Sequence, residues 1–72
     1  MERQSVKSSN IAAIGYDAES QAMEVEFKNG GIFLYSGVEP KQFTDLMVSD
    51  SIGKHFHSKI RSCHECRRVG ND

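Results

Sequence analysis

The sequence predicts a small α+β domain in which a three-stranded antiparallel β-meander is followed by two short helices. Up to about position 36, apolar residues alternate with polar ones, and after Pro40 they recur at helical spacing. A chain of 72 residues has room for one core only. We expect strands at about 10–17, 21–28 and 31–36, and helices at about 40–48 and 51–61 packed on one face.

The second strand carries the clearest pattern in the chain. In AMEVEFK, the apolar residues Met23, Val25 and Phe27 alternate with charged residues, which is the period of a half-buried strand. The first strand, NIAAIGYD, is separated from it by a turn at DAES. In this turn the Asp17 carboxylate can accept hydrogen bonds from the residues that follow.

The NGG sequence at positions 29–31 predicts a hairpin, and the length of its loop decides where the next aromatic side chains point. A two-residue loop places Phe33 and Tyr35 on the charged face, where they form an exposed platform for stacking bases. A three-residue loop, Asn29 to Gly31, pairs Phe33 with Phe27 and Tyr35 with Val25 on the apolar face. We favour the three-residue loop, because aromatic side chains in so small a domain are usually buried.

Two apolar stripes define the helices. Pro40 suits a first helical turn, where its missing N–H is not needed. The stripe of the first helix consists of Phe43, Leu46 and Met47. The sequence VSDS then offers caps for a second helix, namely Ser49, Asp50 and Ser51. The core stripe of that helix consists of Ile52, Phe56 and Ile60.

Charge is distributed unevenly along the chain, although the net charge is only −1. Residues 1–50 contain four basic and eight acidic side chains, a net charge of −4, whereas residues 51–72 contain five basic and two acidic ones, a net charge of +3. A C-terminal basic surface would attract an anionic partner. The candidate nucleic-acid-binding residues are Lys54, His57, Arg61, Arg67 and Arg68. An ordinary solvated helix face explains the same charges, and the overall acidity argues against strong general nucleic-acid binding.

The CHEC sequence at positions 63–66 provides half of the ligands of a tetrahedral zinc site. His55 and His57 cannot both complete such a site from one helix, because residues two apart project about 200° apart. A redox pair needs a βαβ context that this sequence lacks. We therefore expect Cys63 and Cys66 to be incidental thiols, and we expect no metal and no cofactor.

Nothing in the sequence predicts an enzyme or a membrane protein. The histidines are accompanied by no paired carboxylates and no phosphate-binding glycine loop. There is no apolar run long enough to span a membrane, and the first ten residues have no apolar signal region. We expect a non-enzymatic cytoplasmic protein with one domain over residues 6–69 and flexible ends at 1–5 and 70–72.

Three blocks of the sequence resemble the KTSC domain family, which is named from its occurrence at the C-terminus of some lysyl-tRNA synthetases. In VKSSNIAAIGYD the matching residues are Ser8, Ser9, Ile14, Gly15 and Tyr16. In MEVEFKNGGIFLYSGVEP the match is an aromatic-x-aromatic element ahead of a Val-Pro step, here Phe33-Leu34-Tyr35 and Val38-Glu39-Pro40. In SIGKHFHSKIR it comprises Ser51, Gly53, Phe56, Ile60 and Arg61.

The chain also departs from the family pattern. Phe33 replaces the usual first tyrosine, Leu34 replaces a residue that is commonly polar, and Glu39 is inserted into the Val-Pro step. CHECRR stands where the family has an aromatic-rich segment, so the cysteines are particular to this chain. The commonly polar middle residue implies that the two aromatic residues face inward, which supports the three-residue loop.

The resemblance implies RNA binding only by association with a tRNA synthetase. The leading hypothesis is a module that binds RNA, tRNA in particular, through the C-terminal basic surface. The alternatives are a protein-interaction domain, using a sheet edge or the Leu34 region, and a zinc-stabilised module using Cys63 and Cys66. The sequence does not determine the oligomeric state.

Overall fold

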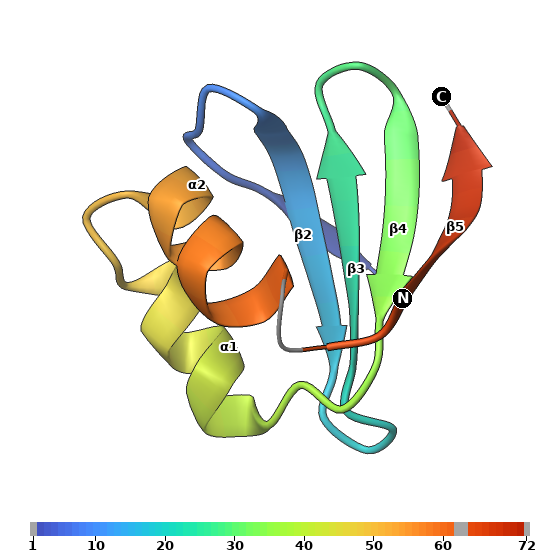
Figure 1. Cartoon of the computed structure of the whole chain (residues 1–72), viewed down its shortest axis with the longest axis vertical. Coiled ribbons are helices and arrows are strands. Elements are labelled where there is room, and N and C mark those ends of the chain that lie inside the picture. Colours follow the sequence, from blue (N-terminus) through green and yellow to red (C-terminus); the bar gives the residue numbers. More distant parts are fainter. Residues whose placement is uncertain (1, 62–63, 72) are drawn as a thin grey trace.

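The computed structural model of the chain describes residues 2–61 and 64–71 (Figure 1). Within these residues, five strands form one antiparallel sheet in chain order. The strands are β1 (Arg3–Ser5), β2 (Ile11–Asp17), β3 (Ala22–Phe27), β4 (Gly31–Tyr35) and β5 (Cys66–Asn71). The helices are α1 (Pro40–Met47), α2 (Ile52–His55) and its π-helical continuation η1 (Phe56–Arg61). All three helical segments lie on the same side of the sheet (Figure 1).

The α+β class and the helices on one face are confirmed, but the prediction of three strands is wrong. Strands β1 and β5 add one edge each to the predicted meander. β1 pairs with β2, with Gln4 opposite Ile14, and β5 pairs with β4, with Leu34 opposite Arg67. Both added strands are polar and lack a period of two, because an edge strand owes its conformation mainly to the partner strand beside it.

The β3–β4 hairpin has the predicted loop length but a different register. Its loop is Lys28 to Gly30, so Phe33 pairs with Val25 and Tyr35 pairs with Met23, two residues away from the expected partners. Gly30 adopts a φ of 99° and donates its N–H to the Phe27 carbonyl at 2.9 Å. A shift of two residues keeps every side chain on its face, so Phe33 and Tyr35 still point toward the helices.

A β-bulge in β2 changes which residues of the first predicted strand point toward the helices. The pairing with β3 shifts between Ile11 and Ala13, so that Ile11 lies opposite Phe27 while Ile14 lies opposite Val25. Both isoleucines are 1% exposed, although they are three residues apart and a regular strand would place them on opposite faces.

The predicted helix starts are confirmed. α1 begins at Pro40, and the Gln42 side-chain oxygen accepts the Glu39 N–H at 2.9 Å. α2 begins after Ser51, whose hydroxyl accepts the Lys54 N–H at 3.3 Å. In the turn before β3, Asp17 accepts the Glu19 N–H as expected.

Phe56 joins the helical layer to the sheet. It is 1% exposed and meets Phe27 at a ring-centroid distance of 5.8 Å and Tyr35 at 5.1 Å, both edge to face. The rest of the buried apolar cluster consists of Ile11, Ile14, Met23, Val25, Val38, Leu46 and Ile60.

The face of the sheet opposite the helices carries a network of ion pairs. The Arg3 guanidinium lies 2.7 Å from the Glu24 carboxylate and 3.4 Å from the Glu26 carboxylate. Leu34 pairs with Glu24 on this face and is half-buried.

We predict that Phe56→Ala lowers the free energy of unfolding by about 3–5 kcal/mol, because it leaves a cavity between the helices and the sheet. Val48→Ala is the matched control, since Val48 is 73% exposed and its truncation is expected to change stability by less than about 0.5 kcal/mol. Urea denaturation followed by circular dichroism measures both. Equal losses in the two variants would contradict the central role of Phe56.

Candidate functional site

A groove lies between the helical layer and the β3–β4 end of the sheet, and we call it the aromatic groove. It encloses about 760 Å³, within the range of small-ligand sites. It is lined by Ser9, Asn10, Phe27, Lys28, Asn29, Phe33, Tyr35, Phe56, His57, Arg61 and Cys66. No acidic residue is among these lining residues.

The apolar part of this groove is a row of aromatic rings. Phe33 meets Phe27 at 5.7 Å with an interplanar angle of 81°, and Phe27 in turn meets Phe56. Phe56 and Tyr35 are buried, whereas Phe27 and Phe33 are half-buried. Solvent therefore reaches the outer end of the row, where Phe33 lies.

The groove has cationic or ionisable side chains on both banks. Lys28 lies in the β3–β4 loop on one bank, and His57 and Arg61 lie on η1 on the other. Arg61 donates from Nη1 to His57 Nδ1 at 3.2 Å. Because a guanidinium can only donate, this contact requires His57 Nδ1 to be the acceptor, and the ring then presents Nε2–H.

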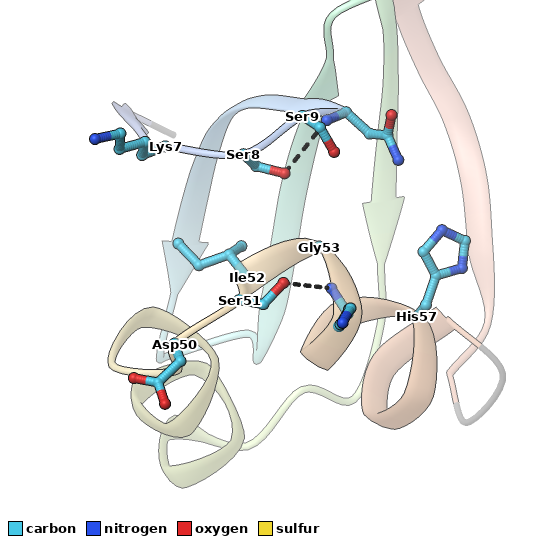
Figure 2. Close-up of a pocket in the computed structure, with 10 residues that line it drawn as sticks. Lys7, Ser8, Ser9, Asp50, Ser51, Ile52, Gly53 and His57 are labelled. Carbon is cyan, nitrogen blue, oxygen red and sulfur yellow. Dashed lines mark hydrogen bonds between the residues drawn. The ribbon is translucent and has the colours of Figure 1, made fainter.

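A second groove, which we call the loop groove, meets the aromatic groove at Ser9, Asn10 and His57. In Figure 2 the Ser8–Ser9 loop and the Ser51–Gly53 segment face each other across it. Its other lining residues are Lys7, Asp50, Ile52 and Lys54.

Two of the serines that line the loop groove hold backbone amides. The Ser8 hydroxyl accepts the N–H groups of Asn10 and Ile11, each at 3.3 Å, and so shapes the turn into β2. A Cβ on Gly53 would lie 3.3 Å from the Ser8 hydroxyl oxygen. This close approach explains why a glycine follows the start of α2. Ser8 thus has a structural role in the turn before β2.

The structure brings three of the five predicted nucleic-acid-binding residues together. Lys54, His57 and Arg61 are exposed along α2 and η1 and line the two grooves. Arg68 pairs with Phe33 and so lies on the helix side of β5, whereas Arg67 pairs with Leu34 on the opposite face of the sheet. Arg67 is therefore separated from the other four.

Nine lining residues of the aromatic groove were not among the predicted site residues, and the candidate site depends most on three of them: Lys28, Phe27 and Phe33. The sequence predicts Phe33 either as part of an exposed platform or as a buried core residue, and the structure shows it half-buried, packed against the core. The hairpin signal placed these residues near one another, but the approach of η1 across the sheet is a long-range contact that no local pattern contains.

The CHEC sequence has a structural role at His64. His64 Nδ1 lies 3.1 Å from the Ser36 carbonyl oxygen, and Nε2 lies 3.2 Å from the Gln42 amide nitrogen. Because Gln42 Oε1 already accepts the Glu39 N–H, the Gln42 amide donates to Nε2, and Nδ1 donates to Ser36. Both ring nitrogens are thus used to hold the segment before β5 against α1.

Zinc ligation finds little support among the described residues. They include no group of three or more His, Cys, Asp or Glu side chains placed to hold a metal ion. Cys66 is a free, exposed cysteine beside Tyr35, and Cys63 lies outside the described residues. The expectation that Cys63 and Cys66 are incidental thiols therefore stays a prediction.

Tyr35 has the most strongly perturbed titration in the groove. Burial raises the pKa of its hydroxyl from 10.0 to about 12, and the charge and hydrogen bond of Cys66 act in the same direction, against an opposing effect of Arg61. The neutral hydroxyl is therefore the form present in the groove at neutral pH.

Comparison with known proteins places this geometry in a family. The family model of the KTSC domain matches residues 7–63. An uncharacterized protein of Stutzerimonas stutzeri is 38% identical over 64 residues, which are 89% of this chain and 90% of that protein. A protein of Tsukamurella paurometabola is 36% identical over 58 residues, 81% of this chain and 87% of the relative.

A solved structure has the same fold. The crystal structure of a KTSC domain protein from Yersinia pestis superimposes with a TM-score of 0.92 at 35% sequence identity, covering 96% of this chain and 97% of that one. Within the part of the chain that the structure describes, no helix is long and apolar enough to cross a membrane.

We predict that the protein loses stability as the pH rises from about 10 to about 12, and that Tyr35→Phe loses less. The sign follows from the raised pKa of Tyr35: above pH 10 the hydroxyl ionises in the unfolded chain before it does in the folded one, so unfolding is favoured. Thermal melts at several alkaline pH values measure the effect. Parallel pH profiles for the two proteins would show that Tyr35 is not responsible.

We also predict that a zinc chelator leaves the melting temperature unchanged, because both nitrogens of His64 are occupied by hydrogen bonds. Cys63→Ser is the companion variant and is expected to melt like the unmodified protein. A lower melting temperature in the presence of the chelator, together with zinc detected by elemental analysis, would support the hypothesis of a zinc-stabilised module.

Proposed function

The chain belongs to the KTSC domain family, and from its two grooves we propose that it is a non-enzymatic cytoplasmic module that binds RNA. The observation that carries the proposal is the acid-free aromatic groove with cationic side chains on both banks. We define the basic rim as Lys28, Lys54, His57, Arg61 and Arg68.

The basic rim supports phosphate binding through local charge. Lys28 and Arg61 are permanently cationic at neutral pH and lie on opposite banks of the aromatic groove. Among the residues that the structure describes, Asp50 is the one acidic side chain that lines either groove, and it belongs to the loop groove. A polyanion that follows the aromatic groove therefore meets positive charge on both sides.

RNA is favoured over other anions by the aromatic rings between the cations. Single-stranded nucleic acids bind where basic side chains track the backbone and aromatic rings meet the bases. The occurrence of the family in some lysyl-tRNA synthetases supports tRNA as a partner by association. Arg67, which was predicted to take part, lies on the other face of the sheet and is left out of the proposed surface.

Protein interaction remains the alternative function, and its strongest feature is the pair of sheet edges at β1 and β5. An exposed edge can pair with a strand of another chain. A pull-down from nuclease-treated lysate that recovers no specific protein would count against it.

We predict that Arg61→Gln weakens binding to a short oligouridine and to tRNA, and lowers the slope of log affinity against log salt by about 0.7, because one phosphate contact is lost. Fluorescence anisotropy between about 50 and 200 mM salt measures both quantities. Lys41→Gln is the matched control, because Lys41 lies on α1 outside both grooves and is paired with Asp45.

Two results would overturn the proposal. The first is the absence of RNA binding even at low salt, which would transfer the proposal to a protein partner. The second is equal affinity and equal salt dependence in Arg61→Gln and Lys41→Gln, which would mean that RNA binds by general charge alone.

A further inference from the structure

We propose that the aromatic groove holds one unpaired nucleobase of the bound strand, stacked on Phe33, while the phosphates on either side of that base contact Lys28 and Arg61. This inference rests on the proposed RNA binding and specifies its ligand. It selects single-stranded segments and loops over uninterrupted duplex.

Phe33 is the ring that a base can reach. It lies at the outer end of the row Phe33–Phe27–Phe56–Tyr35 and is half-buried, whereas Phe56 and Tyr35 are 1% and 3% exposed. Phe27 packs between Phe33 and Phe56. Because the rings of Phe27 and Phe33 are nearly perpendicular, at 81°, a flat base that stacks on Phe33 lies nearly perpendicular to the Phe27 ring.

The polar residues of the groove suit the edge of a base. Asn29 Oδ1 accepts the Gly31 N–H at 3.0 Å, so the Asn29 amide nitrogen is the group that can donate to a ligand. Asn10 and Ser9 also line the groove, and the Asn10 carbonyl accepts the Lys28 N–H at 2.8 Å. Amide and hydroxyl groups of this kind can bind the donors and acceptors of any base, so the site favours an unpaired base without strict sequence choice.

The basic side chains on both banks of the groove argue against a purely apolar ligand. Lys28, His57 and Arg61 line the groove together with the rings, and none of the described lining residues is acidic. A ligand that is both flat and flanked by negative charge satisfies the rings and the cations together, and a nucleotide within a strand has this form. A base inside a duplex is covered by its neighbours on both faces and cannot stack on Phe33.

The test uses the whole chain, three RNA probes and one matched pair of variants. The probes are a short oligouridine, the same strand with abasic sites, and a blunt duplex of equal charge. Phe33→Leu removes the stacking ring but keeps the groove apolar. Phe43→Leu is the control, because Phe43 is a half-buried phenylalanine that stacks on Tyr16 outside both grooves.

We expect Phe33→Leu to bind oligouridine roughly tenfold more weakly than the unmodified protein does, and the abasic strand equally well, because only the stacking contribution is lost. Phe43→Leu should match the unmodified protein with every probe. In the unmodified protein, nuclear Overhauser effects should connect the Phe33 ring to uracil protons, and this measurement does not depend on the folding of a variant.

The outcomes separate the inference from the proposed function. If Arg61→Gln weakens RNA binding but Phe33→Leu does not, RNA binding stands and base stacking on Phe33 is wrong. Equal affinity for the abasic strand and for oligouridine in the unmodified protein would also overturn stacking. A polyglutamate peptide that binds as tightly as oligouridine and loses as much affinity in Phe33→Leu would overturn the nucleotide as the ligand. If no RNA probe binds at low salt, both the proposed RNA binding and the base stacking on Phe33 are wrong.

Discussion

The contact between Phe56 and the sheet is the interaction on which the rest of the structure depends. α2 and η1 together are short, and an isolated helix of that length is not stable in water. Burial of Phe56 against Phe27 and Tyr35 therefore holds the helical layer in place. The same contact creates the aromatic groove, because η1 then carries His57 and Arg61 over the outer part of the sheet while Phe33 stays partly uncovered. Core and candidate site therefore share one row of rings.

Local chemistry explains which features of the fold were predictable. Pro40 and Ser51 mark helix starts because each satisfies a requirement of the helix terminus within a few residues of itself. The face of the sheet on which each β4 side chain lies could be predicted, because an aromatic residue such as Tyr35 is usually buried in a small domain. The register did not follow, since loops of Lys28–Gly30 and Asn29–Gly31 place the same residues on the same faces. β1 and β5 could not be predicted, because RQS and CRRVGN acquire strand structure from β2 and β4 and not from their own pattern.

The sequence predicted most of the basic residues of the candidate site, but it did not predict the groove beside them. The basic residues of the second helix were visible as a cluster, and the structure keeps Lys54, His57 and Arg61 together. Arg67 and Arg68 are neighbours in sequence, but a strand sends them to opposite faces, so only a strand assignment for 66–71 could have divided them. Phe33 and Lys28 join the site through the position of η1, a contact between segments about thirty residues apart. Sequence reasoning had no means to see that approach.

A net charge of −1 is compatible with RNA binding here because two of the acidic residues lie on the face of the sheet that is remote from the basic rim. Glu24 and Glu26 lie on the helix-free face of the sheet, where Arg3 neutralises part of their charge. The basic rim lies on the opposite side of the sheet, the side that the helices cover. The molecule measures 27 × 26 × 22 Å, while exposed charges are screened over about 10 Å at 0.1 M salt. The electrostatic interaction of an RNA strand in the aromatic groove with Lys28, His57 and Arg61 would therefore be far stronger than its interaction with the carboxylates behind the sheet. Raising the salt concentration would weaken RNA binding without making these distant carboxylates more important.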